Sequence, residues 1–119
     1  MVQELVRKLE NGTLTVCVVG VGYVGYPLAK AFSKHCKVIG YDIDSSKVEE
    51  LNGSNNNKQL EFTADDKRVN EADVVIICVP TPVKKSKEPD LGPVESASRA
   101  VGRNLRKGSV VVLESTYYP

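Results

Sequence analysis

Four short runs of almost continuously apolar residues constrain the fold of this sequence more than any other feature. They span residues 14–19, 37–41, 74–79 and 110–113 and are rich in β-branched side chains. This composition is typical of strands buried on both faces of a parallel sheet. A fifth run, residues 60–63, alternates apolar with polar side chains and is predicted to form an edge strand.

Segments with helical periodicity separate these runs. Residues 23–34 repeat apolar side chains at spacings of three and four, and Pro27 favours a helix that begins close to Gly22. A second, shorter helix is predicted after a cap formed by Asp44 or one of the two serines that follow, and Gly53 is expected to end it.

The last predicted helix has Pro93 in its first turn, an apolar stripe that ends with Leu105, and Gly108 as its terminator. Residues 1–12 are expected to add an N-terminal helix on the outside of the domain, or to be partly frayed. Alternating strands and helices imply right-handed crossovers. We therefore expect residues 1–119 to form a single α/β domain with a doubly wound parallel sheet.

Composition excludes several other classes of protein. The 119 residues are 41% hydrophobic and 26% charged, as in ordinary globular domains, and the formal net charge is only +1. No global field favours nucleic acid or an anionic membrane surface. Since no apolar run approaches the roughly 18 residues of a membrane-spanning helix, we expect a soluble, cytoplasmic protein with neither kind of partner.

The cysteines give no sign of a metal site or a disulfide scaffold. Cys17, Cys36 and Cys78 form no CxxC pair, and His35 has no further ligand type at a metal-binding spacing. Cys17 and Cys78 lie inside apolar runs and are expected to be buried small hydrophobes.

The sequence GVGYVG directly follows the first predicted strand and opens the first predicted helix. In this setting Gly20 permits a tight turn, Gly22 lets the backbone approach a pyrophosphate, and Gly25 allows close packing of helix on strand. The N–H groups around Tyr23 and Val24 are then free to bind phosphate. The motif predicts a dinucleotide site, although a glycine turn without a ligand and a site for S-adenosylmethionine are alternatives.

Asp42 ends the second predicted strand, about twenty residues after the glycines. A carboxylate there accepts hydrogen bonds from ribose hydroxyls and repels a 2′-phosphate, which favours NAD over NADP. Asp44 is a rival for this role but is better placed to cap a helix. Lys47 either reaches the adenosine end of the cofactor or is a solvated helix residue.

Polar residues also follow the fourth and fifth strands, at Thr81 and Thr116. Ligands of open parallel sheets bind outside the carboxyl ends of the strands. Together with Gly20 and Asp42, these threonines predict a crevice along one rim, although either threonine alone would be read as a turn residue.

Lys84, Lys85 and Lys87 form a basic segment after Pro82. The segment is interpreted as a solvated, mobile loop, with contact to an anionic partner or to substrate phosphates as the alternative.

The runs VVGVGYVGYPLAKAF, GYDIDSSKVEELN, ADVVIICVPTP, PDLGPVESA and VVLESTYYP resemble the NAD-binding N-terminal domain of the UDP-glucose/GDP-mannose dehydrogenase family. The resemblance implies a Rossmann fold and covers nearly all of the chain after Leu14. The GYPLA and PDL segments are most similar to the branch that acts on UDP-N-acetylmannosamine or UDP-N-acetylglucosamine.

The resemblance implies NAD-dependent oxidation of the C6 alcohol of a UDP-sugar to a carboxylate, in two hydride transfers. It places Val24 and its glycine neighbours at the pyrophosphate, and Asp42 and Lys47 at the adenosine ribose. It places Thr81 at the nicotinamide half and Thr116, as an accessory residue, near the reacting centre.

The family's cysteine nucleophile has no counterpart in this sequence, because Cys17, Cys36 and Cys78 do not occupy that motif. We therefore expect a domain excised from a longer two-domain enzyme, inactive alone, that meets the UDP-sugar through the missing half. Apolar surface left uncovered would make the chain a homo-oligomer. The alternative is a stand-alone NAD-sensing module that acts through a partner.

Overall fold

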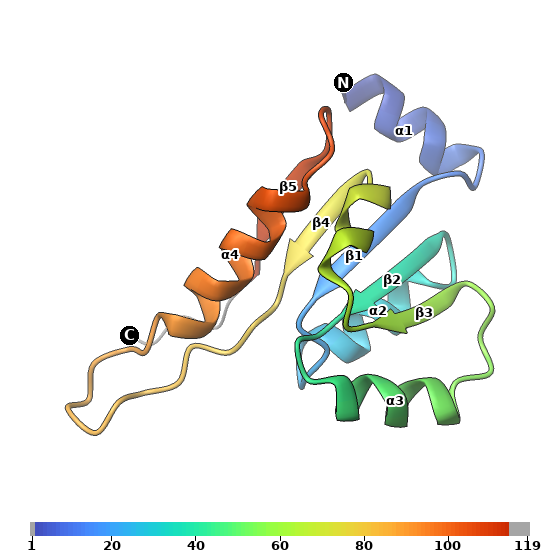
Figure 1. The fold of residues 1–119 in the computed structure, drawn as a ribbon. Helices are drawn as coiled ribbons and strands as arrows, with labels where there is room; N and C mark the ends of the chain where they lie inside the picture. Colours follow the sequence, from blue (N-terminus) through green and yellow to red (C-terminus); the bar gives the residue numbers. More distant parts are fainter. Residues whose placement is uncertain (1, 115–119) are drawn as a thin grey trace.

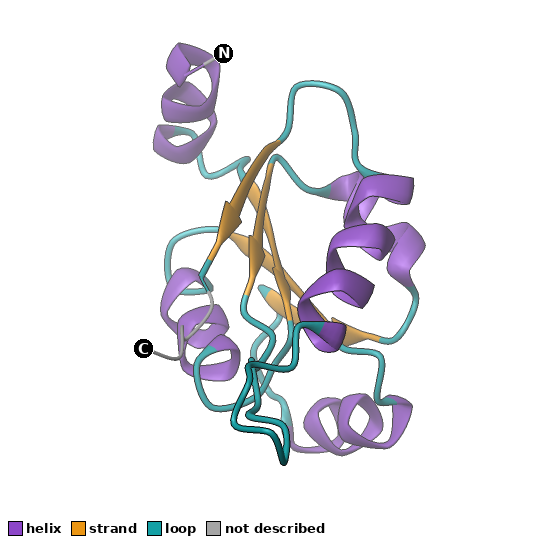
Figure 2. Ribbon diagram, turned by 90° about the vertical axis from the view of Figure 1, so that its left-hand side faces the viewer, coloured by secondary structure: helices purple, strands orange, loops and turns teal. Residues whose placement is uncertain are grey.

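The computed structural model describes residues 2–114 and contains one parallel sheet of five strands. The order β3-β2-β1-β4-β5 reverses direction beside β1, as in a doubly wound sheet, and helices cover both faces (Figures 1 and 2). The elements in chain order are α1 (Val2–Glu10), β1 (Thr15–Val19), α2 (Gly25–Phe32), β2 (Lys37–Tyr41), α3 (Ser45–Ser54), β3 (Leu60–Thr63), the 3₁₀ helix η1 (Asp66–Glu71), β4 (Val74–Ile77), α4 (Gly92–Asn104) and β5 (Val110–Leu113).

Each face of the sheet has its own core. On one face, side chains of β1, β2, β3 and β4 pack against α2 and α3, around the fully buried Val18 and Val38. On the other face, Cys17, Ile39 and Val75 pack against η1 and α4. Because both faces of the central strands β1, β2 and β4 are covered, these strands are apolar at consecutive positions, as the sequence predicts. No described helix is long and apolar enough to cross a membrane.

Several sequence predictions about element ends and burial are wrong. Gly53 lies inside α3, which ends with Asn55 as its C-cap. Helix α4 ends at Asn104, so Leu105 leaves the apolar stripe, and Gly108 (φ 91°) shapes the turn before β5 instead. Strand β5 is not buried on both faces: it is the last strand of the sheet, and Leu113 is 57% exposed. The 3₁₀ helix η1 was not predicted because its six residues show no strong period.

Asp73 ties together the amino-terminal edge of the sheet. Its backbone N–H donates to the Thr15 carbonyl, and its own carbonyl accepts from the Val110 N–H. Its side chain, 8% exposed, accepts from Lys8 Nζ of α1 (2.8 Å), from the Thr15 N–H (3.0 Å) and from the Arg106 guanidinium. One buried carboxylate therefore joins α1, β1 and the turn before β5.

Burial by itself raises the pKa of Asp73, but the hydrogen bonds from Lys8 and Thr15 and the charge of Arg106 hold that pKa below its ordinary value. A carboxyl whose pKa is lowered by folding stabilises the folded state above its unfolded pKa of about 4. That stabilisation is lost as the pH falls through the folded pKa.

We predict that Asp73→Asn lowers the free energy of unfolding at pH 7 by about 1–3 kcal/mol, because two cations lose their charged partner. Denaturant unfolding between pH 7 and pH 2 should show the difference from wild type shrinking below about pH 4. Asp66→Asn is the matched control, since Asp66 pairs at 3.2 Å with the largely exposed Arg103 and its loss should change stability by less than about 1 kcal/mol. Equal effects of the two variants would contradict the role of Asp73.

The start of α2 lies directly against the end of β1. A Cβ atom added to Gly25 would lie 1.7 Å from the Gly20 carbonyl oxygen, so no side chain fits at this position. Gly20 has φ 94°, a left-handed conformation that favours glycine, and it turns the chain from the strand toward the helix. The helix begins at Gly25, later than the expected start near Gly22, because residues 22–24 form the turn that brings Pro27 into the first turn.

We predict that Gly25→Ala lowers the melting temperature by more than 10 °C, because the added methyl group forces helix and strand apart; a loss of about 3 kcal/mol moves a domain of this size by this much. Gly22→Ala is the control, since a Cβ atom there meets nothing within 4 Å and its φ is ordinary. Thermal unfolding followed by circular dichroism should leave the Gly22→Ala melting temperature within a few degrees of wild type. A Gly25→Ala protein as stable as wild type would refute the packing role.

Candidate functional site

A cleft of about 1090 Å³ lies at the carboxyl ends of β1, β2 and β4. Three loops at one rim of the sheet line it, together with residues of α2, α3 and α4. The loop residues that line the cleft are Gly20, Val21, Gly22, Tyr23, Val24, Asp42, Ile43, Val79, Pro80, Thr81 and Pro82. The sequence prediction of a crevice along one rim is therefore confirmed for the loops after β1, β2 and β4.

The glycine loop lines this cleft and has backbone N–H groups without a partner in the described part of the chain. Val24 precedes α2 without any side-chain cap. Among the described residues, no backbone or side-chain group accepts a hydrogen bond from the N–H of Gly22, Tyr23 or Val24. A Cβ atom on Gly22 would meet nothing within 4 Å, so the space above the loop is open. Free donors, open space and a helix N-terminus fit the pyrophosphate of a dinucleotide.

Asp42 holds the shape of this loop. One carboxylate oxygen accepts from the Val21 N–H at 3.1 Å, and the other accepts from the Asp44 N–H at 3.0 Å. Lys47 Nζ lies 3.8 Å from the first of these oxygens, and the Asp42 side chain is 13% exposed. A carboxylate has about four acceptor positions, so Asp42 can still accept from ribose hydroxyls.

Asp44 caps a helix, which is the alternative to ribose binding that the sequence allowed for it. Its side chain accepts from the N–H groups of Ser46 and Lys47, both at 3.1 Å, and it is the N-cap of α3. The capping prediction for Asp44 is confirmed. Lys47, in the first turn of the same helix, is a residue of the cleft wall rather than a fully solvated lysine.

Only one of the two predicted threonines, Thr81, lies within the described residues. Thr81 is half-buried and lines the cleft between Pro80 and Pro82. Thr116 lies outside the described residues. Glu114, the last described residue, follows β5 and lines the cleft, and its N–H donates to the Ile77 carbonyl at 2.8 Å.

Sequence reasoning missed the wall that α4 contributes. Pro93, Ser96, Ala97 and Ala100 line the cleft. Ser96 and Ala100 are four residues apart and hence on one helix face, but no sequence signal distinguished a face toward a ligand from a face toward the core. Glu50 of α3 was missed for the same reason, because an exposed helix carboxylate has no distinctive pattern.

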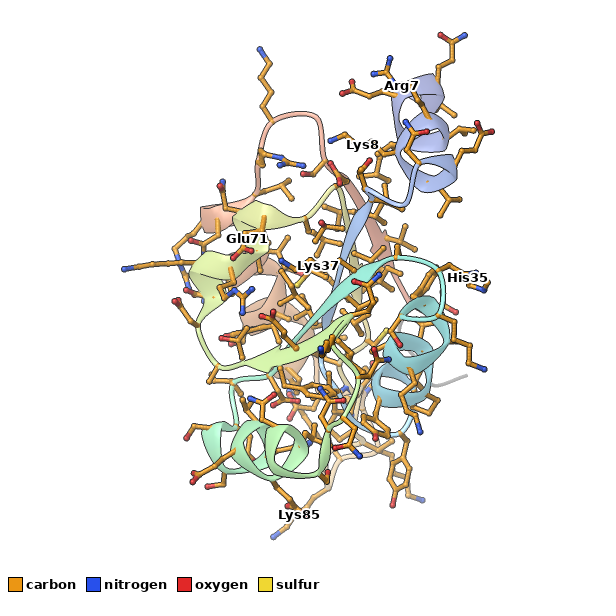
Figure 3. The ribbon with its side chains drawn as sticks, turned by 90° about the vertical axis from the view of Figure 1, so that its right-hand side faces the viewer. Arg7, Lys8, His35, Lys37, Glu71 and Lys85 are labelled. Atoms are coloured by element: carbon orange, nitrogen blue, oxygen red, sulfur yellow. The ribbon has the colours of Figure 1, made fainter. Side chains whose placement is uncertain are left out.

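Cys17 and Cys78 are buried as expected, and Cys36 is buried as well. Burial raises the pKa of Cys17 to about 12 and also raises the pKa of Cys36 and of Cys78. His35 is exposed beyond the end of α2, at the edge of the view in Figure 3. Within residues 2–114, no group of three or more His, Cys, Asp or Glu side chains could hold a metal ion.

Known proteins share both this sequence and this fold. A UDP-N-acetyl-D-glucosamine 6-dehydrogenase of Pseudomonas aeruginosa is 39% identical, over 89% of this chain and 28% of its own length. A UDP-N-acetyl-D-mannosamine dehydrogenase of Campylobacter jejuni is 40% identical, over 85% of this chain and 28% of its own length. The structure of a UDP-D-ManNAc dehydrogenase from Pyrococcus horikoshii superposes with a TM-score of 0.80 and 31% identity, covering 89% of this chain and 29% of that one.

The chain thus spans less than a third of the length of these relatives. The family model of the UDP-glucose/GDP-mannose dehydrogenase family, NAD binding domain, matches residues 14–56 and 52–119. These matches include the glycine loop, Asp42 and Thr81, which the structure brings to one cleft. The chain therefore belongs to the UDP-glucose/GDP-mannose dehydrogenase family and carries its NAD-binding domain.

Proposed function

We propose that this chain is the cofactor-binding part of an NAD-dependent dehydrogenase that oxidises the C6 alcohol of a UDP-N-acetylhexosamine to the uronic acid. The observation that carries the proposal is the cleft, where the open glycine loop and Asp42 lie side by side. The substrate class is supported by the relatives named above, which are dehydrogenases of UDP-N-acetylglucosamine and UDP-N-acetylmannosamine.

In this proposal the free N–H groups of Gly22, Tyr23 and Val24 bind the pyrophosphate, with the positive end of the α2 dipole behind them. Gly20, which also lines the cleft, and Gly25 belong to the same cofactor-binding loop, and their close approach holds the loop against β1. Bound NAD supplies the hydride acceptor of the reaction, and conversion of an alcohol to a carboxylate consumes two NAD and one water.

At the adenosine end, Asp42 accepts hydrogen bonds from the ribose hydroxyls, and Lys47 lies close enough to contact the same ribose. Thr81, between two prolines of the cleft wall, contacts the nicotinamide half. Thr116 is proposed as an accessory residue that holds a water or a substrate oxygen, because a threonine hydroxyl is too weak an acid to act as a base without help.

We propose that the chain alone does not turn over a UDP-sugar. The only cysteine among the described residues of the cleft wall is Cys78, which is 6% exposed. Burial, aided by the charge of Glu114, raises the pKa of its thiol, so little nucleophilic thiolate exists at neutral pH.

We predict no formation of NADH when the purified chain is incubated with NAD and UDP-N-acetylglucosamine or UDP-N-acetylmannosamine. Absorbance at the NADH wavelength measures this, and calorimetric titration with NAD in the same buffer shows that the cofactor site is intact. Steady NADH production that depends on the UDP-sugar would overturn the proposal that this chain alone has no usable nucleophile.

We predict that the chain binds NAD at least tenfold more tightly than NADP, because the Asp42 carboxylate repels a 2′-phosphate. Asp42→Asn, which keeps an oxygen for the Val21 N–H, should reduce this preference severalfold. Calorimetric titration of both cofactors into both proteins measures the four affinities. Equal affinities of the wild type for NAD and NADP would remove the proposed role of Asp42.

Asp44→Ala is the matched control for this titration. It removes a neighbouring carboxylate and the cap of α3, so it should lower the free energy of unfolding by about 1 kcal/mol. The ratio of NAD to NADP affinity should remain at the wild-type value. If both variants change that ratio alike, the discrimination depends on general charge rather than on Asp42.

A further inference from the structure

The charged residues that line the cleft are unfavourable for an anionic ligand. The described lining has the carboxylates of Asp42, Glu50 and Glu114 and only one ammonium group, that of Lys47. NAD brings two negative charges on its pyrophosphate into this surrounding. The N-terminus of α2 offsets about half a charge. A source of positive potential near the mouth of the cleft would therefore speed the entry of the cofactor.

The basic segment after Pro82 is such a source, and it is a hairpin with its own hydrogen bonds. The N–H of Asp90 donates to the Pro82 carbonyl at 2.6 Å, and the N–H of Lys84 donates to the Glu88 carbonyl at 2.8 Å. An antiparallel bridge pairs Val83 with Pro89. We call residues 82–90 the basic hairpin. It extends beyond the end of β4, in yellow and orange at the lower left of Figure 1.

All three lysines of the basic hairpin are solvent-exposed. They have no ion-pair partner among the described residues, so their charges are free to act on a ligand. Lys87 has φ 68°, a left-handed backbone conformation that glycine adopts more easily than lysine. Figure 3 shows Lys85 projecting from the end of the molecule opposite to Arg7 and Lys8.

The basic hairpin is close enough to the cleft for its charges to be felt there. Pro82, where the hairpin begins, is part of the cleft wall. Consecutive Cα atoms are 3.8 Å apart, so the Cα of Lys84 lies within about 8 Å of that of Pro82. This is about one Debye length at physiological ionic strength. Glu88 and Asp90 offset part of this charge, so the hairpin has three positive and two negative side chains and a net charge of +1.

We propose that the basic hairpin attracts the pyrophosphate of NAD electrostatically and accelerates its entry into the cleft. The proposal rests on the cofactor role of the cleft given above. Charges at the rim of a binding site change the association rate and its salt dependence more than they change the dissociation rate. The lysines of the hairpin therefore act on the encounter with the cofactor, whereas the glycine loop and Asp42 hold the cofactor once it is bound.

The test is stopped-flow measurement of NADH binding by its own fluorescence, at ionic strengths from 0.01 to 0.5 M. The hairpin variant is Lys84→Gln/Lys85→Gln/Lys87→Gln, which removes the three charges and keeps polar side chains. The charge-matched control is Lys34→Gln/Lys58→Gln/Lys107→Gln, because these lysines are exposed and do not line the cleft. Both variants lose the same net charge, so only the position of the charges differs between them.

We expect the hairpin variant to bind NADH with an association rate roughly 3–10-fold below wild type at low salt, with an unchanged dissociation rate. The difference should vanish at 0.5 M salt because the Debye length there is only a few ångström. The control variant should associate at nearly the wild-type rate.

Equal slowing in both variants would show that net charge, not the hairpin, controls association, and would overturn the proposal. A change confined to the dissociation rate would overturn it as well. Melting temperatures of both variants, expected to match wild type, identify any loss of folding. If the wild type itself does not bind NADH, the cofactor role of the cleft is refuted, whereas normal binding with no effect of the hairpin variant refutes only this proposal.

Discussion

The contact between Gly25 and the Gly20 carbonyl determines where the functional part of the molecule lies. A Cβ atom at Gly25 would be 1.7 Å from that oxygen, so only glycine fits at the first residue of α2. The start of the helix fixes which N–H groups remain unpaired among the described residues, namely those of residues 22–25. A packing requirement between one strand and one helix therefore positions these donors in the loop that lines the cleft.

Asp42 adds a second constraint on the same loop. Its carboxylate joins the end of β2 to the Val21 N–H and to its own following turn. The residue proposed to bind the ribose is thus also the one that holds the glycine loop in shape before any ligand arrives. A site with this property loses little conformational freedom on binding, and this preorganisation favours affinity.

The sequence predicted the features that depend on local patterns. The strands, the tight turn at Gly20 and the cap at Asp44 are specified within a few residues, by apolar runs, a glycine conformation and a carboxylate near free N–H groups. The features that depend on which distant element covers a surface could not be predicted. The α4 wall of the cleft and the exposure of β5 belong to this second class.

The exposed outer strand has a consequence for handling the protein. Strand β5 presents Val111, Val112 and Leu113 with exposures of 42%, 40% and 57%, and its sequence VVVL contains neither a charge nor a proline. Natural sheets blunt their outermost strands with lysine, proline or a bulge, since bare backbone groups there recruit strands of other molecules. Concentrated or partly unfolded preparations are therefore most vulnerable to β-type aggregation at this strand, and a lysine at position 112 would be the most direct way to suppress it.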